Sequence, residues 1–219
     1  MQKYLYLTLL LQICIHQNDA FAIPSPSTFD FPSLEENVKV GGRDIVTHVK
    51  YVDASLRKLT GRGVCERMNI DLDPTTKEAS SDVSTCSSSD DVYRAICKND
   101  QYVLITHGTQ ADPIYNFGNV ACLTAFHRAY DDLITMPSRL CVVHKSQDEV
   151  LRNELMTKVT NDGFVEGAYR GYRIRGDGKF IKLTNAVVWN CYGDDGVYIG
   201  QAALFDRNIS PIVDSTDDE

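Results

Sequence analysis

The sequence predicts one α+β domain over residues 44–205: a five-stranded antiparallel sheet with helices packed on one face, plus an N-terminal amphipathic helix. Three observations predict this fold class. Two short strand patterns lie near the middle of the chain, helical patterns follow them, and three longer strand patterns joined by glycine turns close the domain. A domain of this size can bury a core without help from disulfides.

The opening helix is predicted from apolar spacing in residues 44–59. Apolar side chains recur there every three or four positions, at Ile45, Val49, Val52, Leu56 and Leu59. Gly61 and Gly63 follow, and glycine is the residue that most readily ends a helix. We expect this helix to dock onto the sheet.

Two acidic segments are expected to lie outside the packed domain. Residues 71–91 are rich in Ser, Thr and Asp and offer almost nothing to bury, which predicts a disordered insertion. Residues 206–219 are predicted to form an acidic tail. Because these segments hold the excess negative charge of the chain, the remainder is close to neutral, and no basic patch for nucleic acid is implied.

The middle of the domain is predicted to be mostly helical. A short helix over 90–97 precedes a hairpin whose strands are 102–106 and 113–116. Short helices over 119–127 and 130–135 follow, and Met136-Pro137 breaks the second. A longer amphipathic helix over 146–160 is expected to bury one face and to stop near Gly163; that face comprises Val150, Leu151, Leu155 and Val159.

Three strands end the domain, over 165–174, 179–190 and 197–205. Gly176-Asp-Gly178 and Gly193-Asp-Asp-Gly196 join them, and both are hairpin turn signals. These strands form an antiparallel meander beside the earlier hairpin.

Several short motifs together resemble the MEKHLA domain family, which has a PAS-like fold. They are Tyr102-Val-Leu-Ile-Thr-His-Gly108, Asp112-Pro-Ile-Tyr-Asn-Phe-Gly-Asn119, Met136-Pro-Ser-Arg139, Gly171-Tyr-Arg-Ile-Arg175, Val187-Val-Trp-Asn190 and Gly200-Gln-Ala-Ala-Leu-Phe205. Each motif is weak alone, and the set is specific. The resemblance covers residues 44–205 and implies a free-standing member with a pocket between the sheet and the helical middle.

The chain also departs from that family. The 71–91 insertion is unlike compact members, Cys141 replaces an expected small Ser or Ala, and neither a homeodomain nor a leucine zipper precedes the domain. The control of transcription-factor dimerisation that the plant homeodomain relatives imply therefore does not transfer whole.

The N-terminal region resembles a two-part targeting sequence. Residues 1–20 have a basic start, an apolar run and small residues near Ala20, as in a signal peptide. Phe21 opens a Ser- and Pro-bearing stretch over 21–40, which resembles the plastid transit segment of algae with complex plastids. We expect plastid import, with secretion as the alternative, and no membrane span in the mature protein.

The cysteines are expected to be mostly reduced. Cys14 lies in the leader, and the others are spread widely, at Cys65, Cys86, Cys97, Cys122, Cys141 and Cys191. This spread is unlike the dense disulfide framework of a small secreted domain. Cys122 lies in an apolar run and is interpreted as a packed small hydrophobe.

Polar and aromatic residues near the expected pocket are the ligand-site candidates. They are His107, Tyr115, Asn116, Cys122, Phe126, Arg139, Arg173, Trp189 and Gln201. A structural role is the alternative for each: Asn116 can fix a turn, Arg139 can pair with a carboxylate, and Trp189 can be core.

No catalytic or metal-binding residues are predicted. The sequence has no Gly-x-Ser-x-Gly elbow and no dinucleotide-binding glycine motif. Cys141, His144 and His127 lack the second pair typical of structural zinc, so packing is favoured. The Asn-Cys-Arg-Phe-Leu-Gln motif of flavin-binding light sensors of this fold is absent, so the cofactor is unknown.

Three functions remain open at this level. The leading hypothesis is a sensory module that binds a small apolar or redox-active ligand and signals through altered protein contacts. The alternative is a ligand-free interaction module that forms a homodimer or binds a protein partner, and an uncharacterised enzyme is the third. The character of the cavity discriminates between them, because a sensor needs a pocket with convergent polar groups.

Overall fold

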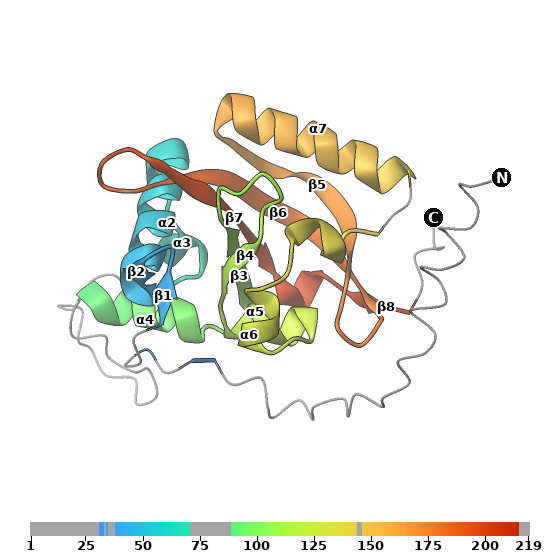
Figure 1. Cartoon of the computed structure of the whole chain (residues 1–219), viewed down its shortest axis with the longest axis horizontal. Coiled ribbons are helices and arrows are strands. Elements are labelled where there is room, and N and C mark those ends of the chain that lie inside the picture. The colour runs from blue at the N-terminus through green and yellow to red at the C-terminus, as the bar shows by residue number, and fades with distance from the viewer. Residues whose placement is uncertain (1–30, 33, 35–37, 71–88, 144–145, 215–219) are drawn as a thin grey trace.

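The computed structural model describes residues 31–32, 34, 38–70, 89–143 and 146–214 (Figure 1). The predicted signal peptide, most of the transit segment and most of the acidic insertion lie outside these residues. None of the helices in the described ranges has the length and apolar character needed to span a bilayer.

The predicted antiparallel sheet is confirmed. Its strands lie in the order β4-β3-β7-β6-β5, and their bounds are β3 Tyr102–His107, β4 Tyr115–Gly118, β5 Phe164–Ile174, β6 Phe180–Tyr192 and β7 Tyr198–Asp206. A separate two-stranded hairpin, β1 Lys39–Val40 and β2 Arg43–Asp44, precedes the first helix.

Part of the predicted acidic tail is structured. After a 3-10 turn at Arg207–Ile209, β8 (Ile212–Val213) pairs with β6 opposite Ile181 and Phe180. The net negative charge of residues 206–219 predicted an unpaired tail. Backbone hydrogen bonds to the open edge at this end of β6 instead hold its first part against the sheet. The expected tail boundary at residue 206 is therefore too early.

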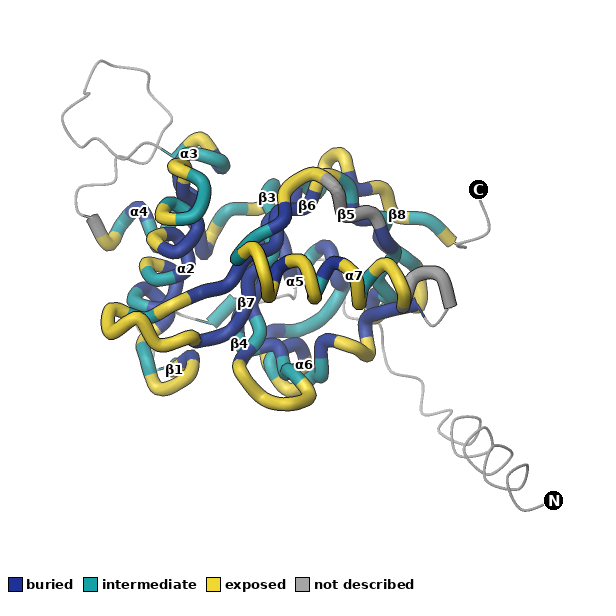
Figure 2. The backbone as a smooth tube through the Cα atoms, turned by 90° about the horizontal axis from the view of Figure 1, so that it is seen from above, coloured by how far each residue is buried: buried dark blue, intermediate teal, exposed yellow. Residues whose placement is uncertain are grey.

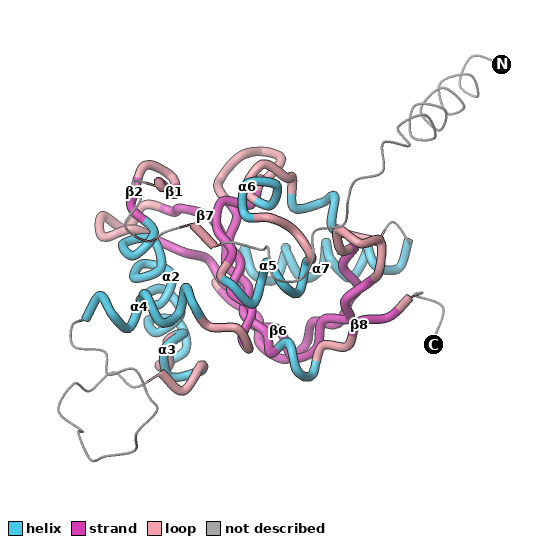
Figure 3. The backbone as a smooth tube through the Cα atoms, turned by 90° about the horizontal axis from the view of Figure 1, so that it is seen from below, coloured by secondary structure: helices cyan, strands magenta, loops and turns pink. Residues whose placement is uncertain are grey.

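Helices cover both faces of the sheet, as Figure 3 shows. On one face lie α5 (Val120–Phe126), α6 (Tyr130–Leu133), the 3-10 helix η2 (Ser138–Cys141) and α7 (Ser146–Asp162). On the other face lie α2 (Ile45–Thr60), α3 (Val64–Arg67) and α4 (Ser89–Lys98). The expected helical layer on one face is present, and the N-terminal helix adds a second layer on the opposite face. Because α4 begins at Ser89, the last residues of the predicted insertion belong to this helix.

The opening helix forms where apolar spacing placed it. Asp44 caps its start by accepting a hydrogen bond from the amide of Thr47 at 2.9 Å. Gly61 ends it with a φ of 78°, a conformation that costs glycine little. The predicted apolar stripe of α2 is buried against the sheet, apart from partly buried Leu59.

Two apolar cores result, one on each face, and strand alternation divides the residues between them. Figure 2 shows that much of the sheet is buried, whereas α7 carries many exposed residues. On β3, Val103 and Ile105 point to the core under α5–α7, whereas Leu104 points to the core under α2. We call the first face the inner face and the second the outer face.

A β-bulge in β6 changes which residues face inward. Ile181 and Leu183 belong to the inner core, but so do Ala186 and Val188, which have the opposite parity. Asn185 lies between the two pairs with a φ of 52°, beside a shift in the pairing of β5 with β6. Trp189 consequently faces outward, and its indole Nε1 donates to the carbonyl of Val52 on α2 at 3.1 Å.

The outer core contains a buried histidine. His48 on α2 is 2% exposed, and its Nε2 lies 3.0 Å from Thr106 Oγ1. The Thr106 hydroxyl donates to Asn116 Oδ1, so it accepts a hydrogen bond from His48 Nε2. His48 Nδ1 then has no partner among the described residues. Burial, with a smaller contribution from Arg43, lowers the pKa of His48 to about 4.

This pKa predicts acid sensitivity. Unfolded His48 titrates near 6.5, above its folded pKa, so its stabilisation is present above about pH 6.5 and is lost as the pH falls toward 4. His48→Gln should reduce the loss of unfolding free energy between pH 7 and pH 4 by about 3 kcal/mol. Urea unfolding of the wild type and of the His48→Gln variant at pH 7 and pH 4 measures this difference. The titration of carboxylates affects both proteins equally, so it cancels when their pH dependences are subtracted. Equal pH dependence in both proteins would contradict the assignment.

Candidate functional site

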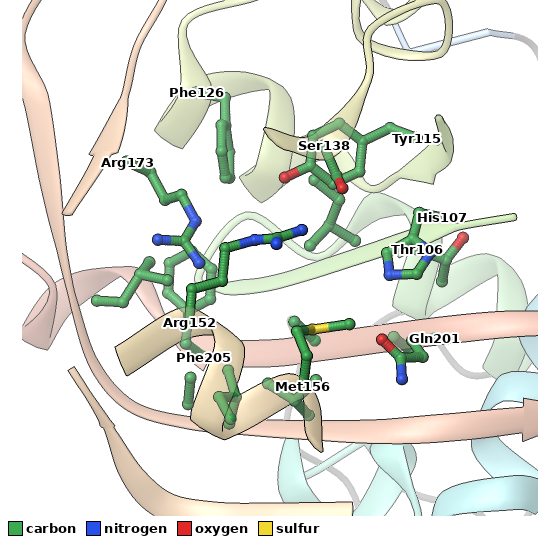
Figure 4. A pocket seen from close by; sticks show the side chains of 17 residues that line it. Thr106, His107, Tyr115, Phe126, Ser138, Arg152, Met156, Arg173, Gln201 and Phe205 are labelled. Atoms are coloured by element: carbon green, nitrogen blue, oxygen red, sulfur yellow. The ribbon is translucent and has the colours of Figure 1, made fainter. Parts of the chain in front are cut away.

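A cavity of about 80 Å³ lies between the inner face of the sheet and α7 (Figure 4). Much of its wall is apolar, formed by Ile105, Phe126, Leu155, Leu183, Val188 and Phe205. One water molecule needs about 10–15 Å³ of cavity volume, so this cavity admits about five to eight water-sized groups. This is small for a ligand pocket, since drug-sized sites are roughly 300–1,000 Å³.

Gln201 on β7 supplies an unpaired acceptor to the cavity. Asn190 Nδ2 donates to the carbonyl of Val159 at 3.1 Å, which fixes the orientation of the Asn190 amide. Gln201 Nε2 then donates to Asn190 Oδ1 at 3.0 Å. Gln201 Oε1 is buried and has no hydrogen-bond partner in the described part of the chain. The carbonyl of Val159 thus determines, through Asn190, which end of Gln201 is left for a ligand.

His107 on β3 lies directly opposite Gln201. The two strands approach closely because the preceding residue is Gly200, where a Cβ would overlap the carbonyl oxygen of His107. His107 Nδ1 donates to the carbonyl of Gly108 at 2.9 Å, which leaves Nε2 without a proton in the neutral ring. Burial lowers the pKa of His107, and the hydrogen bond to the carbonyl of Gly108 opposes that shift. The neutral ring therefore presents a second acceptor.

Two arginines bring positive charge to the same cavity. Arg152 comes from α7 and Arg173 from β5, and Figure 4 shows both side chains extending into the cavity. Arg173 Nη1 donates to the carbonyl of Tyr172 at 3.0 Å. The charge of Arg152 contributes to the lowered pKa of His107. No Asp or Glu is among the described residues that line the cavity.

Two hydroxyl groups complete the lining. Ser138 on η2 is 7% exposed, and its Oγ has no hydrogen-bond partner within the described ranges. Burial raises the pKa of Tyr115 well above its usual value, so its phenol keeps its proton. Buried polar groups are normally satisfied, so unpaired ones that face a cavity indicate a ligand or ordered water.

The structure brings together five of the residues proposed from sequence: His107, Tyr115, Phe126, Arg173 and Gln201 line the cavity. The others do not line it. Arg139 is exposed and pairs with Asp112, with Nε 3.0 Å from Oδ2. Asn116 bonds to Thr106, which connects it to His48.

Cys122 and Trp189 are packing residues. Cys122 is fully buried in the inner core, and burial raises the pKa of its thiol well above the usual value, as expected for an unreactive cysteine. Cysteines within the described residues are free. Trp189 is confirmed as core, but in the core on the outer face, so it cannot contact this cavity.

Sequence reasoning missed Arg152 and Ser138. It placed Val150 and Leu151 on the buried face of α7, but they are 55% and 41% exposed. The stripe that faces inward is Arg152, Leu155, Met156 and Val159, with the same spacing of three and four. Tracing the stripe back from Val159 would have found Arg152. Ser138 gave no comparable signal, because only the turn at η2 directs it inward.

A curved antiparallel sheet with helices packed on it and a small, partly polar cavity beneath α7 defines a PAS-like α+β domain. The model of the MEKHLA domain matches residues 47–209, so the chain belongs to the MEKHLA domain family. Among curated proteins, none matches this chain.

Solved structures with PAS and LOV folds are similar to it at low sequence identity. A PAS domain from Colwellia psychrerythraea is 18% identical with a TM-score of 0.38, over 53% of this chain and 88% of that one. A variant of the fungal photoreceptor VVD is 12% identical with a TM-score of 0.45, over 77% of this chain and 95% of that one. The LOV domain from a blue-light activated histidine kinase of Erythrobacter litoralis is 16% identical with a TM-score of 0.40, over 48% of this chain and 95% of that one.

Proposed function

We propose that this chain is a sensory module in which a small molecule occupies the inner cavity and changes the contacts that the domain makes with another protein. The observation that carries the proposal is the pair of buried polar atoms, Ser138 Oγ and Gln201 Oε1, that have no partner among the described residues and belong to residues lining one cavity. If apolar side chains had filled the space between the sheet and α7, a pure interaction module would have been favoured. The polar lining favours a polar ligand over the apolar one expected from sequence.

Helix α7 is the element best placed to report occupancy. Its inward residues Arg152, Leu155 and Met156 line the cavity, while Val150 and Leu151 on the same helix are exposed. A ligand that draws Arg152 inward would shift the helix and its exposed apolar side chains together, because helices move as rigid units. Altered contacts at that exposed surface are the proposed output.

Native mass spectrometry on the chain purified from a photosynthetic host tests this function. We expect a non-covalent small-molecule mass that disappears under denaturing conditions. Ala203 lines the cavity, so Ala203→Leu should fill it and abolish the additional mass. Ala111→Leu is the matched control, because Ala111 is exposed in the β3–β4 turn, and this variant should keep the mass.

A ligand-free wild-type protein would contradict the sensory proposal. If the ligand-free protein were also a dimer, the interaction-module hypothesis would replace the sensory proposal. An additional mass retained equally by the Ala203→Leu and Ala111→Leu variants would place the ligand outside this cavity and would also overturn the proposal.

A further inference from the structure

We propose that residues 31–40 form a strap that stays in the mature protein, so that removal of the N-terminal targeting sequence ends before Phe31. The transit segment expected from sequence spans residues 21–40, and this inference divides it into a removable part and a structural part. The inference is independent of the sensory function and of the route, because plastid import and secretion both leave a mature chain.

Phe31 packs against both apolar cores. Its ring lies edge-on to the ring of Phe117, with 6.2 Å between the centroids, and edge-on to the ring of Tyr130 at 5.5 Å. Phe117 belongs to the outer core and Tyr130 to the inner core, and both are buried. Edge-to-face contacts of this kind stabilise aromatic side chains beyond the burial of their surface. One side chain therefore joins the cores of the two faces.

This contact lies at the β4 edge of the sheet. Phe117 is on β4, which ends the strand order β4-β3-β7-β6-β5, and α6, which carries Tyr130, packs on the same strand. At an end strand the cores of the two faces are separated by a single strand, so apolar side chains there need cover from another part of the chain. Phe31 supplies such cover.

The other end of the strap is part of the fold as well. β1 pairs with β2, and Val40 is 1% exposed in the outer core. Leu34 and Val38 lie between Phe31 and Val40 in the sequence and are partly buried against the outer core. Asp44 at the end of β2 caps α2, so the strap leads directly into the first helix. Apolar contacts thus occur at both ends of residues 31–40 and between them.

Removal of the whole 21–40 segment would open both cores. Phe117 and Tyr130 would lose contact with Phe31, and the outer core would lose Val40. Apolar surface exposed in this way lowers the stability of the domain and favours aggregation. Targeting sequences are absent from the mature protein, so a segment that completes both cores belongs to the domain instead.

The intact mass of the protein purified from its native cells tests where removal ends. We expect a processed chain that lacks the leader and still contains Phe31. A first residue after Phe31 would overturn the proposal. An unprocessed chain that keeps the leader would also overturn it, because no removable part would then exist.

Trypsin digestion of the full chain under native conditions tests the strap itself. Lys39 is exposed in β1, next to buried Val40, so cleavage after Lys39 requires the strap to open locally. Phe31→Ala removes the aromatic contacts, and we expect cleavage after Lys39 at least about tenfold faster than in the wild type. Cleavage after Lys158, which is exposed on α7, should keep its wild-type rate, because α7 packs on β5 and β6.

Tyr192→Ala is the matched control, because Tyr192 is an aromatic residue that is 40% exposed at the end of β6. This variant should leave cleavage after Lys39 unchanged. Equal rates after Lys39 in the wild type and in Phe31→Ala would show that Phe31 does not hold the strap. Faster cleavage after both Lys39 and Lys158, or an equal effect of Tyr192→Ala, would show general destabilisation and would also reject the strap.

Discussion

Replacing Trp189 with alanine should lower the free energy of unfolding by about 3 to 5 kcal/mol. The indole is fully buried in the outer core, and its Nε1 donates to the carbonyl of Val52. The substitution therefore leaves a large cavity between α2 and the sheet and also removes the indole hydrogen bond that connects β6 to the backbone of α2. Urea unfolding curves at neutral pH measure the change.

Tyr198→Ala is the control for that experiment. Tyr198 is an aromatic residue on neighbouring β7, but it is 40% exposed and packs edge-on against Tyr192. Its loss should cost about 1 kcal/mol or less. A loss below 1 kcal/mol for Trp189→Ala would contradict the assignment of Trp189 as the residue that joins α2 to the sheet.

Replacing Asn119 with alanine should lower the free energy of unfolding by about 3 kcal/mol or more. Asn119 is fully buried at the start of α5, and its Oδ1 accepts from the amides of Leu104 and Cys122 at 3.0 and 3.1 Å. Its Nδ2 lies within hydrogen-bonding distance of the carbonyls of Ile96, Asn99 and Tyr102. One side chain thus satisfies backbone groups of α4, β3, α5 and the loop between α4 and β3. Alanine leaves the buried amides of Leu104 and Cys122 without the acceptor that Asn119 Oδ1 provides.

The matched control is Asn116→Ala on β4. Asn116 is only partly buried, and its side chain contacts the hydroxyl of Thr106. We expect a loss of about 1 kcal/mol. Hydrogen exchange adds a local test, since the amides of Leu104 and Cys122 should lose protection in the Asn119 variant and keep it in the Asn116 variant. Equal losses of stability would show that the Asn119 contacts contribute little.

Local signals in the chain were sufficient to predict most elements. The stripe from Ile45 to Leu56 predicted α2, and the glycines after it predicted the end of that helix. Alternating apolar residues and glycine turns predicted β5, β6 and β7 and their antiparallel pairing. These features depend on neighbours a few residues away, so they can be read without knowledge of the fold.

The candidate site was predicted less completely, and two particular residues explain why. A strict two-residue period along β6 places Trp189 on the same face as Ile181 and Leu183, but the bulge at Asn185 turns it to the other face. On α7, Leu151 and Arg152 are adjacent, so a small rotation of the helix decides which one points inward. Packing of α7 against β5 selects Arg152, and no composition rule anticipates an arginine that lines a cavity.

By itself, the sequence determined the fold class, the order of the elements, the family and five of the cavity-lining residues. Only the tertiary structure decided that helices cover both faces, that β8 extends the sheet, and that two arginines line the same small cavity as two polar atoms that have no partner among the described residues. The physical reason is distance along the chain. Ser138, Arg152, Arg173 and Gln201 lie on separate elements, and their proximity depends on strand register and helix rotation, which the packing of the whole domain sets.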